Sequence, residues 1–200
     1  MRFRTRDLVY VGILGALWGA VEASLGSVLH ALRVPFAGLV LSGVGIAIAL
    51  CGRILVPRAG TIALIGLVTA FVKMLSVGGL VLNVMIGIVI ESLLAEAVVD
   101  LLRPSRGTFL LAGAVATTWT LAHPFLSGGI LGGQGFVAVF VTMVKSAAGI
   151  LGLDTSAVAL VLGVLVALHV GAGAVCGVIG WDAGQMARGR LHPSPDEVDQ

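Results

Sequence analysis

Long apolar segments alternate with short polar breaks along the chain, and this pattern predicts a series of membrane-spanning helices. A bilayer core of about 30 Å requires about 20 apolar residues in helical form. The breaks contain proline or glycine, which end helices through a missing N–H group or a freer backbone. The first apolar segment is about twice as long as the apolar core of a signal peptide, so we expect an uncleaved span. The pattern predicts six spans, at residues 8–32, 36–52, 59–79, 81–102, 108–127 and 155–183.

The stretch from 128 to 154 fits two interpretations. Its glycine-rich start, GGILGGQG, is followed by FVAVFVTMVKSAAGILG, which is either a seventh span or a helix at the membrane surface. Cytoplasmic loops collect Lys and Arg. A seventh span would move Arg188 and Arg190 outside and leave Lys145 near the middle of the membrane. Six spans with a cytoplasmic N-terminus instead keep most arginines inside: Arg2, Arg4, Arg6, Arg53, Arg58, Arg103, Arg106, Arg188 and Arg190.

We therefore expect an all-α membrane protein with six transmembrane helices and both termini in the cytoplasm. Residues 136–150 then form an outer-face helix or lid between the fifth and sixth spans. Residues 1–187 make a single transmembrane domain, and residues 188–200 make a polar cytoplasmic tail.

Composition leads to the same class of protein. Of the 200 residues, 58% are hydrophobic and 11% are charged, and the mean hydropathy is +1.10. Soluble domains carry roughly twice that charged fraction. The net charge of +2 does not indicate a nucleic-acid partner, because topology explains most of the basic residues. We expect a multi-pass protein of the cytoplasmic (inner) membrane.

The common catalytic signatures are absent from the sequence. It contains no GxxxxGK[ST], GxSxG or HExxH motif, so we expect neither enzyme activity nor a cofactor. Glu91, Glu96, His123 and His169 match no metal-ligand spacing, and we expect no metal site. The sequence GAGAVCG at residues 171–177 lies inside an apolar span, where it predicts close helix contacts rather than dinucleotide binding.

Small residues form a stripe along the first span. At 100° per residue, five of them share one narrow face: Gly12, Ala16, Ala20, Ala23 and Ser27. Such a stripe lets a second helix approach closely, because no long side chain holds it away. Glu22 lies off this stripe, on the side of Gly15 and Gly26.

Ionisable residues inside a membrane are costly, so each one is a functional candidate. At 1.5 Å per residue, Glu22 and Glu91 lie about 15 Å below the outer ends of their spans, and Lys73 about 9 Å. Asn83 and His123 are close to the outer ends. These depths predict a pocket for a small polar molecule in the outer half of the bundle, with Trp119 or Trp18 as a stacking surface. The predicted substrate-binding residues are Glu22, Lys73, Asn83, Glu91, Trp119 and His123.

Each of these side chains also has a structural interpretation. Lys73 is positioned to pair with Glu91 or Glu22 and so to lock the fold. His123, directly before a proline, can cap its helix, and His169 on an apolar face is typical of a packing histidine. Glu96 and Asp100 lie one turn apart at the cytoplasmic end, where they pair with Arg103 or face partner proteins.

The size, the topology, the lack of an ATPase motif and an Ala-xxx-Ala pair in the first helix resemble one known family. Ala16 and Ala20, in GALWGA, match this pair in the S components of energy-coupling factor (ECF) transporters. The resemblance implies a substrate-capture subunit that binds a small water-soluble vitamin or precursor at the outer face. It also implies that Ala16 and Ala20 dock on a transmembrane coupling subunit, which two cytoplasmic ATPases drive. The N-terminal histidine of nickel and cobalt members is absent, since Arg2 and Phe3 occupy those places.

Two functions of other classes remain open. A stand-alone proton-coupled secondary transporter would use Glu22 or Glu91 as its proton-carrying group. An intramembrane enzyme would need a nucleophile or a metal constellation at one depth. Co-purification with an ATPase favours the ECF reading, whereas uptake driven by a proton gradient alone favours the secondary transporter.

Overall fold

The computed structural model describes residues 3–75 and 81–191, and every regular element in these ranges is a helix. Within these ranges, five helices are long and apolar enough to cross a membrane: α1, α2, α4, α5 together with the π-helical segment after it, and α7. The other two apolar helices, α3 and α6, are shorter. The elements are α1 (Thr5–Ala31), α2 (Ala37–Leu55), α3 (Thr61–Met74), α4 (Val81–Leu102), α5 (Arg106–Pro124), the π-helical segment (Phe125–Leu131), α6 (Phe136–Leu151) and α7 (Val158–Leu191).

The expectation of an all-helical membrane protein is thus confirmed at the level of five candidate spans. The third expected span, residues 59–79, is helical over Thr61–Met74, and its end at 76–79 lies outside the described residues. The tail expected at 188–200 also lies mostly outside them, and its first residues continue α7 as far as Leu191.

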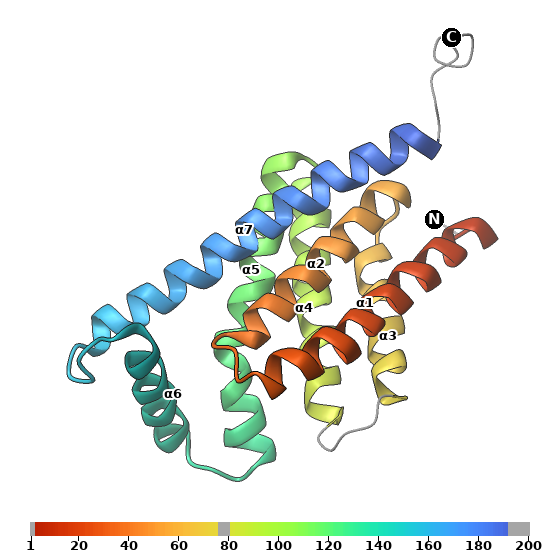
Figure 1. Cartoon of the computed structure of the whole chain (residues 1–200). Coiled ribbons are helices and arrows are strands. Elements are labelled where there is room, and N and C mark those ends of the chain that lie inside the picture. The colour runs from red at the N-terminus through yellow and green to blue at the C-terminus, as the bar shows by residue number, and fades with distance from the viewer. Residues whose placement is uncertain (1–2, 76–80, 192–200) are drawn as a thin grey trace.

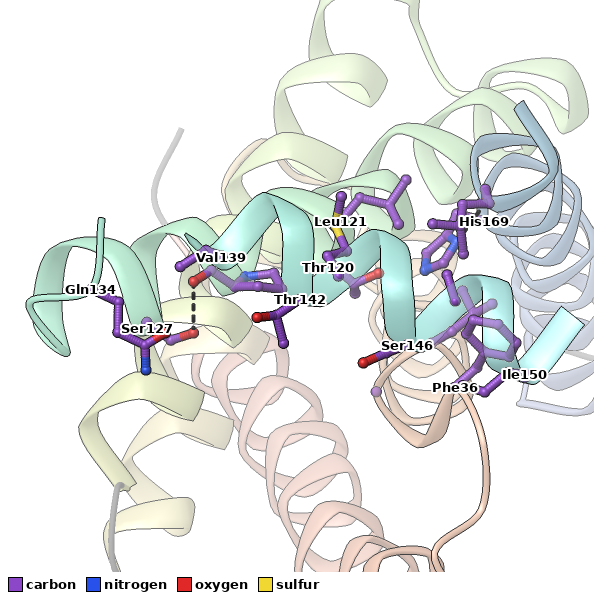
Figure 2. Close-up of a pocket in the computed structure, with 17 residues that line it drawn as sticks. Phe36, Thr120, Leu121, Ser127, Gln134, Val139, Thr142, Ser146, Ile150 and His169 are labelled. Carbon is purple, nitrogen blue, oxygen red and sulfur yellow. Dashed lines mark hydrogen bonds between the residues drawn. The ribbon is translucent and has the colours of Figure 1, made fainter. Parts of the chain in front are cut away.

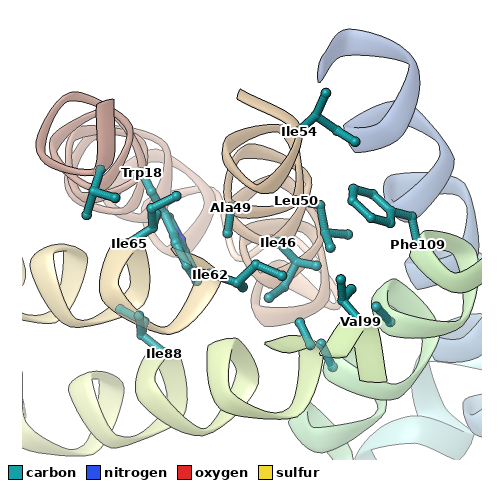
Figure 3. Close-up of a cluster of buried hydrophobic side chains, with 14 residues drawn as sticks. Trp18, Ile46, Ala49, Leu50, Ile54, Ile62, Ile65, Ile88, Val99 and Phe109 are labelled. Carbon is teal, nitrogen blue, oxygen red and sulfur yellow. The ribbon is translucent and has the colours of Figure 1, made fainter. Parts of the chain in front are cut away.

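Helix α2 lies at the centre of the bundle and contacts α1, α3, α4, α5 and α7 (Figure 1). Its Ile46, Ala49 and Leu50 are fully buried. Figure 3 shows them facing Ile62 of α3 and Phe109 of α5 in the main hydrophobic core. Because α2 is surrounded, close packing of its side chains links five other helices at once.

Two glycines of α1 face the bundle interior and bring α1 against α3. A Cβ on Gly15 would lie 2.6 Å from Val68, and a Cβ on Gly19 would lie 2.6 Å from Val72. Only glycine allows so close an approach of the two helices.

Trp18, named above as an alternative stacking surface, belongs to this core. It is fully buried, and its indole ring occupies the space that a side chain at Gly45 of α2 would need. Its position therefore serves packing between α1 and α2.

Helices α5 and α7 meet through their backbones. A Cβ on Gly113 would overlap the carbonyl oxygen of Gly173, and a Cβ on Gly177 would overlap that of Phe109. The hydroxyl of Thr117 donates a hydrogen bond of 2.9 Å to the carbonyl oxygen of His169 across the same contact. The close helix contacts predicted from GAGAVCG are confirmed.

The described ends of the chain lie at one end of the bundle (Figure 1). Charged side chains join helices there: the guanidinium of Arg53 lies 2.7 Å from Asp100 and 3.7 Å from Glu96. Glu96 also accepts hydrogen bonds from the backbone N–H groups of Ile62 and Ala63, at 2.6 and 3.1 Å, at the start of α3.

The prediction that Glu96 and Asp100 pair with Arg103 is therefore wrong. Both carboxylates pair with Arg53 instead. Arg103 is exposed, in the turn after α4, with a positive φ of 65°. Arg53, which was expected in a loop, lies in the last turn of α2 and is 7% exposed. Helix α2 packs against α4, so its last turn brings the guanidinium of Arg53 to the carboxylates of Glu96 and Asp100. Spacing along the sequence alone favours Arg103, which is nearer in the chain.

Helix α6 is attached at the opposite end of the bundle, beside the first half of α7 (Figure 1). It packs through a small cluster of its own, in which Val144 and Ala148 contact Val161 and Leu165 of α7. The chain enters and leaves α6 through glycines with positive φ: Gly133 and Gly152 both have a φ of 66°. Helix α6 is therefore an appendage of the bundle rather than a member of its main core.

We expect the glycine contact between α5 and α7 to be sensitive to any added side chain. Gly177→Leu should destabilise the protein by about 3 kcal/mol or more, because the two backbones must separate. Gly171→Leu is the matched control: a Cβ there has no neighbour within 4 Å. Thermal unfolding in detergent measures both, and equal melting temperatures for the two variants would contradict the prediction.

Candidate functional site

A cavity of about 400 Å³ lies between α6 and the rest of the bundle (Figure 2). It lies at the end away from the described chain termini, since its walls come from the start of α2, the end of α5 and the first half of α7. Ligand pockets in proteins range over about 300–1,000 Å³, so this volume suits a small organic molecule. The lining residues are Phe36, Gly38, Leu39, Thr120, Leu121, Pro124, Ser127, Gly128, Gln134, Val139, Thr142, Met143, Ser146, Ala147, Ile150, Leu165 and His169.

The π-helical segment after α5 forms one end of this cavity. Pro124 lacks a backbone N–H group and so disturbs the regular hydrogen-bond ladder where α5 ends. The chain continues from Phe125 to Leu131 in the wider π-helical form, which is common at functional sites. This segment carries Ser127, whose hydroxyl donates to the carbonyl oxygen of Pro124 at 3.3 Å (dashed line in Figure 2).

Helix α6 supplies the cavity with hydroxyl groups. Thr142 and Ser146 are four residues apart, so they share one face of the helix. Figure 2 shows both side chains leaving α6 on the same side. This spacing is readable from the sequence, but hydroxyl groups do not ionise and so do not stand out among apolar residues as charged groups do.

His169 lies at the other end of the cavity, close to Phe36. Its ring is only 4% exposed and meets the Phe36 ring edge-on at a centroid distance of 6.3 Å. The Nδ1 atom lies 2.7 Å from the carbonyl oxygen of Leu165, where it donates a hydrogen bond. The sequence favoured a packing histidine here; the structure gives the ring a packing position that also borders the cavity.

None of the six predicted substrate-binding residues lines this cavity. Three of them meet elsewhere, between α1, α3 and α4. The Nζ atom of Lys73 lies 3.8 Å from the Glu22 carboxylate and donates to the Glu22 carbonyl oxygen at 3.3 Å. Glu91 is 6% exposed and interacts electrostatically with Glu22. Of the two pairings considered for Lys73, the structure has the one with Glu22.

The other three predicted residues come from α4 and α5. His123 Nε2 lies 3.1 Å from the backbone carbonyl oxygen of Asn83, and the ring packs on Gly87. Two of these three residues each have a buried side-chain atom without a hydrogen-bond partner: Oδ1 of Asn83 and Nε1 of Trp119. Glu22, Lys73 and Glu91 thus form a charged cluster, and His123 and Asn83 lie at a contact between α4 and α5. The structure does not gather the predicted set around the described cavity.

The predicted docking residues are exposed. Ala16 and Ala20 both lie on the outer surface of α1, whereas Gly15 and Gly19, one residue before each, face the interior. The small residues of this helix therefore serve two surfaces, one internal and one external.

Within residues 3–75 and 81–191, no three His, Cys, Asp or Glu side chains gather where they would hold a metal ion.

No protein-family model, curated protein or solved structure matches this chain.

We expect Lys73→Met to cost about 3–5 kcal/mol of stability, because it leaves a buried carboxylate without its cation. A Lys73→Met/Glu22→Gln double variant removes both charges and should regain most of this loss. Thermal unfolding compares the three proteins. A single variant as stable as the parent protein, but unable to bind ligand, would instead assign Lys73 a direct role with substrate.

Proposed function

We propose that this protein is the substrate-capture subunit of an ECF-type importer in the cytoplasmic membrane. It binds a small organic molecule, expected to be a vitamin or a precursor, at the outer face. It then delivers this molecule inward together with a transmembrane coupling subunit and two cytoplasmic ATPases. The observation that carries the proposal is the cavity beneath α6, at the end of the bundle away from the described chain termini.

The proposed topology has six spans, with α3 as the sixth spanning segment and α6 as an outer-face lid. The described part of α3 is 14 residues long, or about 21 Å, and the expected span continues into residues 76–79. The common position of the start of α1 and the end of α7 supports an even number of spans (Figure 1). The separate packing cluster of α6 supports its role as a lid.

The proposed docking surface is the side of α1 that points away from the bundle, around Ala16 and Ala20. Both residues are exposed, and a Cβ on Gly12, one turn earlier, would meet nothing within 4 Å. Large apolar side chains flank them, with Ile13 60% and Leu17 49% exposed. A partner helix would pack closely on such a surface, because the alanines leave room for its backbone.

An Ala16→Leu/Ala20→Leu double variant tests this docking surface. We expect it to lose the ATPase activity that co-purifies with the tagged parent protein, because the added side chains hold the partner helix away. It should keep the melting temperature of the parent protein. The control is Ala167→Leu/Gly171→Leu, a pair of exposed small residues at the same spacing on α7. Equal recovery of ATPase activity with both double variants would refute docking at Ala16 and Ala20.

Cysteine labelling in intact cells tests the topology, in a background where Cys51 and Cys176 are replaced by alanine. Cysteines at Arg103 and Arg190 should react only after the membrane is permeabilised, whereas a cysteine at Arg33 should react from outside. All three residues are exposed in the structure. Labelling of position 190 from outside would restore a seventh span and overturn the proposed topology.

Glu91 favours one alternative function, a proton-coupled secondary transporter. Two carboxylates, Glu22 and Glu91, are buried in the bundle, and Lys73 pairs with Glu22. A buried carboxylate inside a membrane is a candidate carrier of protons, which points to Glu91. This alternative is supported if the Ala16→Leu/Ala20→Leu variant still accumulates substrate, and if a protonophore or Glu91→Gln abolishes that uptake.

A further inference from the structure

The cavity beneath α6 is uncharged. Among the described residues that line it, only His169 can titrate, and no lysine, arginine, aspartate or glutamate takes part. Arg33 and Lys145, on the neighbouring turn and on α6 itself, are exposed and do not line it. A charged ligand would leave water for a cavity without a counter-charge, which is costly.

Several polar groups that line the cavity already donate a hydrogen bond to a backbone carbonyl oxygen. Thr120 donates its hydroxyl hydrogen to the carbonyl oxygen of Thr117 at 2.8 Å. Ser127 and the Nδ1 atom of His169 donate in the same way to Pro124 and Leu165. What these groups retain is acceptor capacity: hydroxyl lone pairs and, in the neutral imidazole, the Nε2 atom. At these three groups, therefore, the cavity favours a ligand that donates hydrogen bonds.

The remaining walls are apolar. Phe36 and Leu39 come from the start of α2, Leu121 from α5, and Met143 and Ile150 from α6. Apolar walls with a few placed polar groups are typical of sites that enclose the body of a small molecule and orient it. Figure 2 shows His169 and Phe36 near one end of α6, and Ser127 and Gln134 near the other.

We propose that this cavity takes an uncharged, mostly apolar organic molecule that donates a hydrogen bond from a hydroxyl or N–H group to His169. The inference rests on the proposed function, because it names the chemical class of the captured molecule. It assigns His169 as the acceptor of that hydrogen bond.

Two probes that share one ring system separate charge from shape. They are 2-naphthalenemethanol, which is uncharged and has a donating hydroxyl group, and 2-naphthoate, which carries a negative charge. Isothermal titration calorimetry on the full chain in nanodiscs measures both. We expect the alcohol to bind at least about tenfold more tightly than the carboxylate, because no cation lines the cavity.

A matched pair of variants on α6 locates the binding. Ser146→Trp places a large side chain in the cavity and should abolish saturable binding of the alcohol. Gly149→Trp adds the same side chain to the same helix, at a residue that does not line the cavity and where a Cβ meets nothing within 4 Å. This control should bind as the parent protein does.

The role of His169 is tested with His169→Phe and a third probe, 2-ethylnaphthalene, which lacks the hydroxyl group. The parent protein should prefer the alcohol over this hydrocarbon by about twofold to tenfold, the effect of one hydrogen bond. In His169→Phe the preference should disappear while the hydrocarbon still binds. Retention of the full preference in this variant would overturn the assignment of His169.

The outcomes separate this inference from the proposed function. Tighter binding of the carboxylate, lost in Ser146→Trp but not in Gly149→Trp, would overturn the chemical class and leave the cavity as a capture site. Binding of every probe at equal strength to the parent protein and Ser146→Trp would overturn both.

Discussion

Where α5 and α7 cross, Gly113 meets Gly173 and Gly177 with no side chain between the two backbones. In a membrane, apolar side chains gain little by leaving lipid for protein, so close packing and hydrogen bonds between helices carry the association. The hydrogen bond from Thr117 to the His169 carbonyl oxygen crosses the same contact. Further along α7, Gly180 and Gly184 lie against α2 in the same way. One glycine-lined helix thus fixes the positions of the central helix and of α5.

The cavity follows from this crossing. The same turn of α7 that bonds to Thr117 also presents the His169 ring to the cavity. The first half of α7 extends beyond the glycine contact and carries Val161 and Leu165, on which α6 packs. Pro124 and the π-helical segment after it line the space between α6 and the end of α5. Helix crossing, helix irregularity and an appended helix together make the site.

Charged side chains join other helices, at both ends of the bundle. Glu96 binds the first N–H groups of α3 and also meets Arg53 of α2, so one carboxylate joins three helices. Near the other end, Lys73 joins α3 to α1 through Glu22. Buried ion pairs contribute little net stability, but removing one partner is costly, so they act mainly to exclude other arrangements of the helices. The cavity contains no such pair, and its chemistry is correspondingly neutral.

The sequence by itself determined the class of protein, the helices and the residues that allow close contacts. Apolar length and Pro or Gly breaks set the helix positions, because these are local properties of the chain. The small-residue pattern at 171–177 also predicted a helix contact, since a missing side chain allows one regardless of the partner. Glu22 and Lys73, whose positions along their helices predicted similar depths, do meet.

Only the tertiary structure decided which groups surround the cavity. Thr142 and Ser146 come from α6 and His169 comes from α7, so their relation depends on how α6 packs against α7. The position of a residue along its helix predicts its depth in the membrane. It does not predict how the helix is rotated about its axis or how it crosses its neighbours, and these decide which side chains line the same cavity. The same reason explains why Arg53, rather than the nearer Arg103, meets Glu96 and Asp100: electrostatic partners are chosen by distance in space, which helix packing sets.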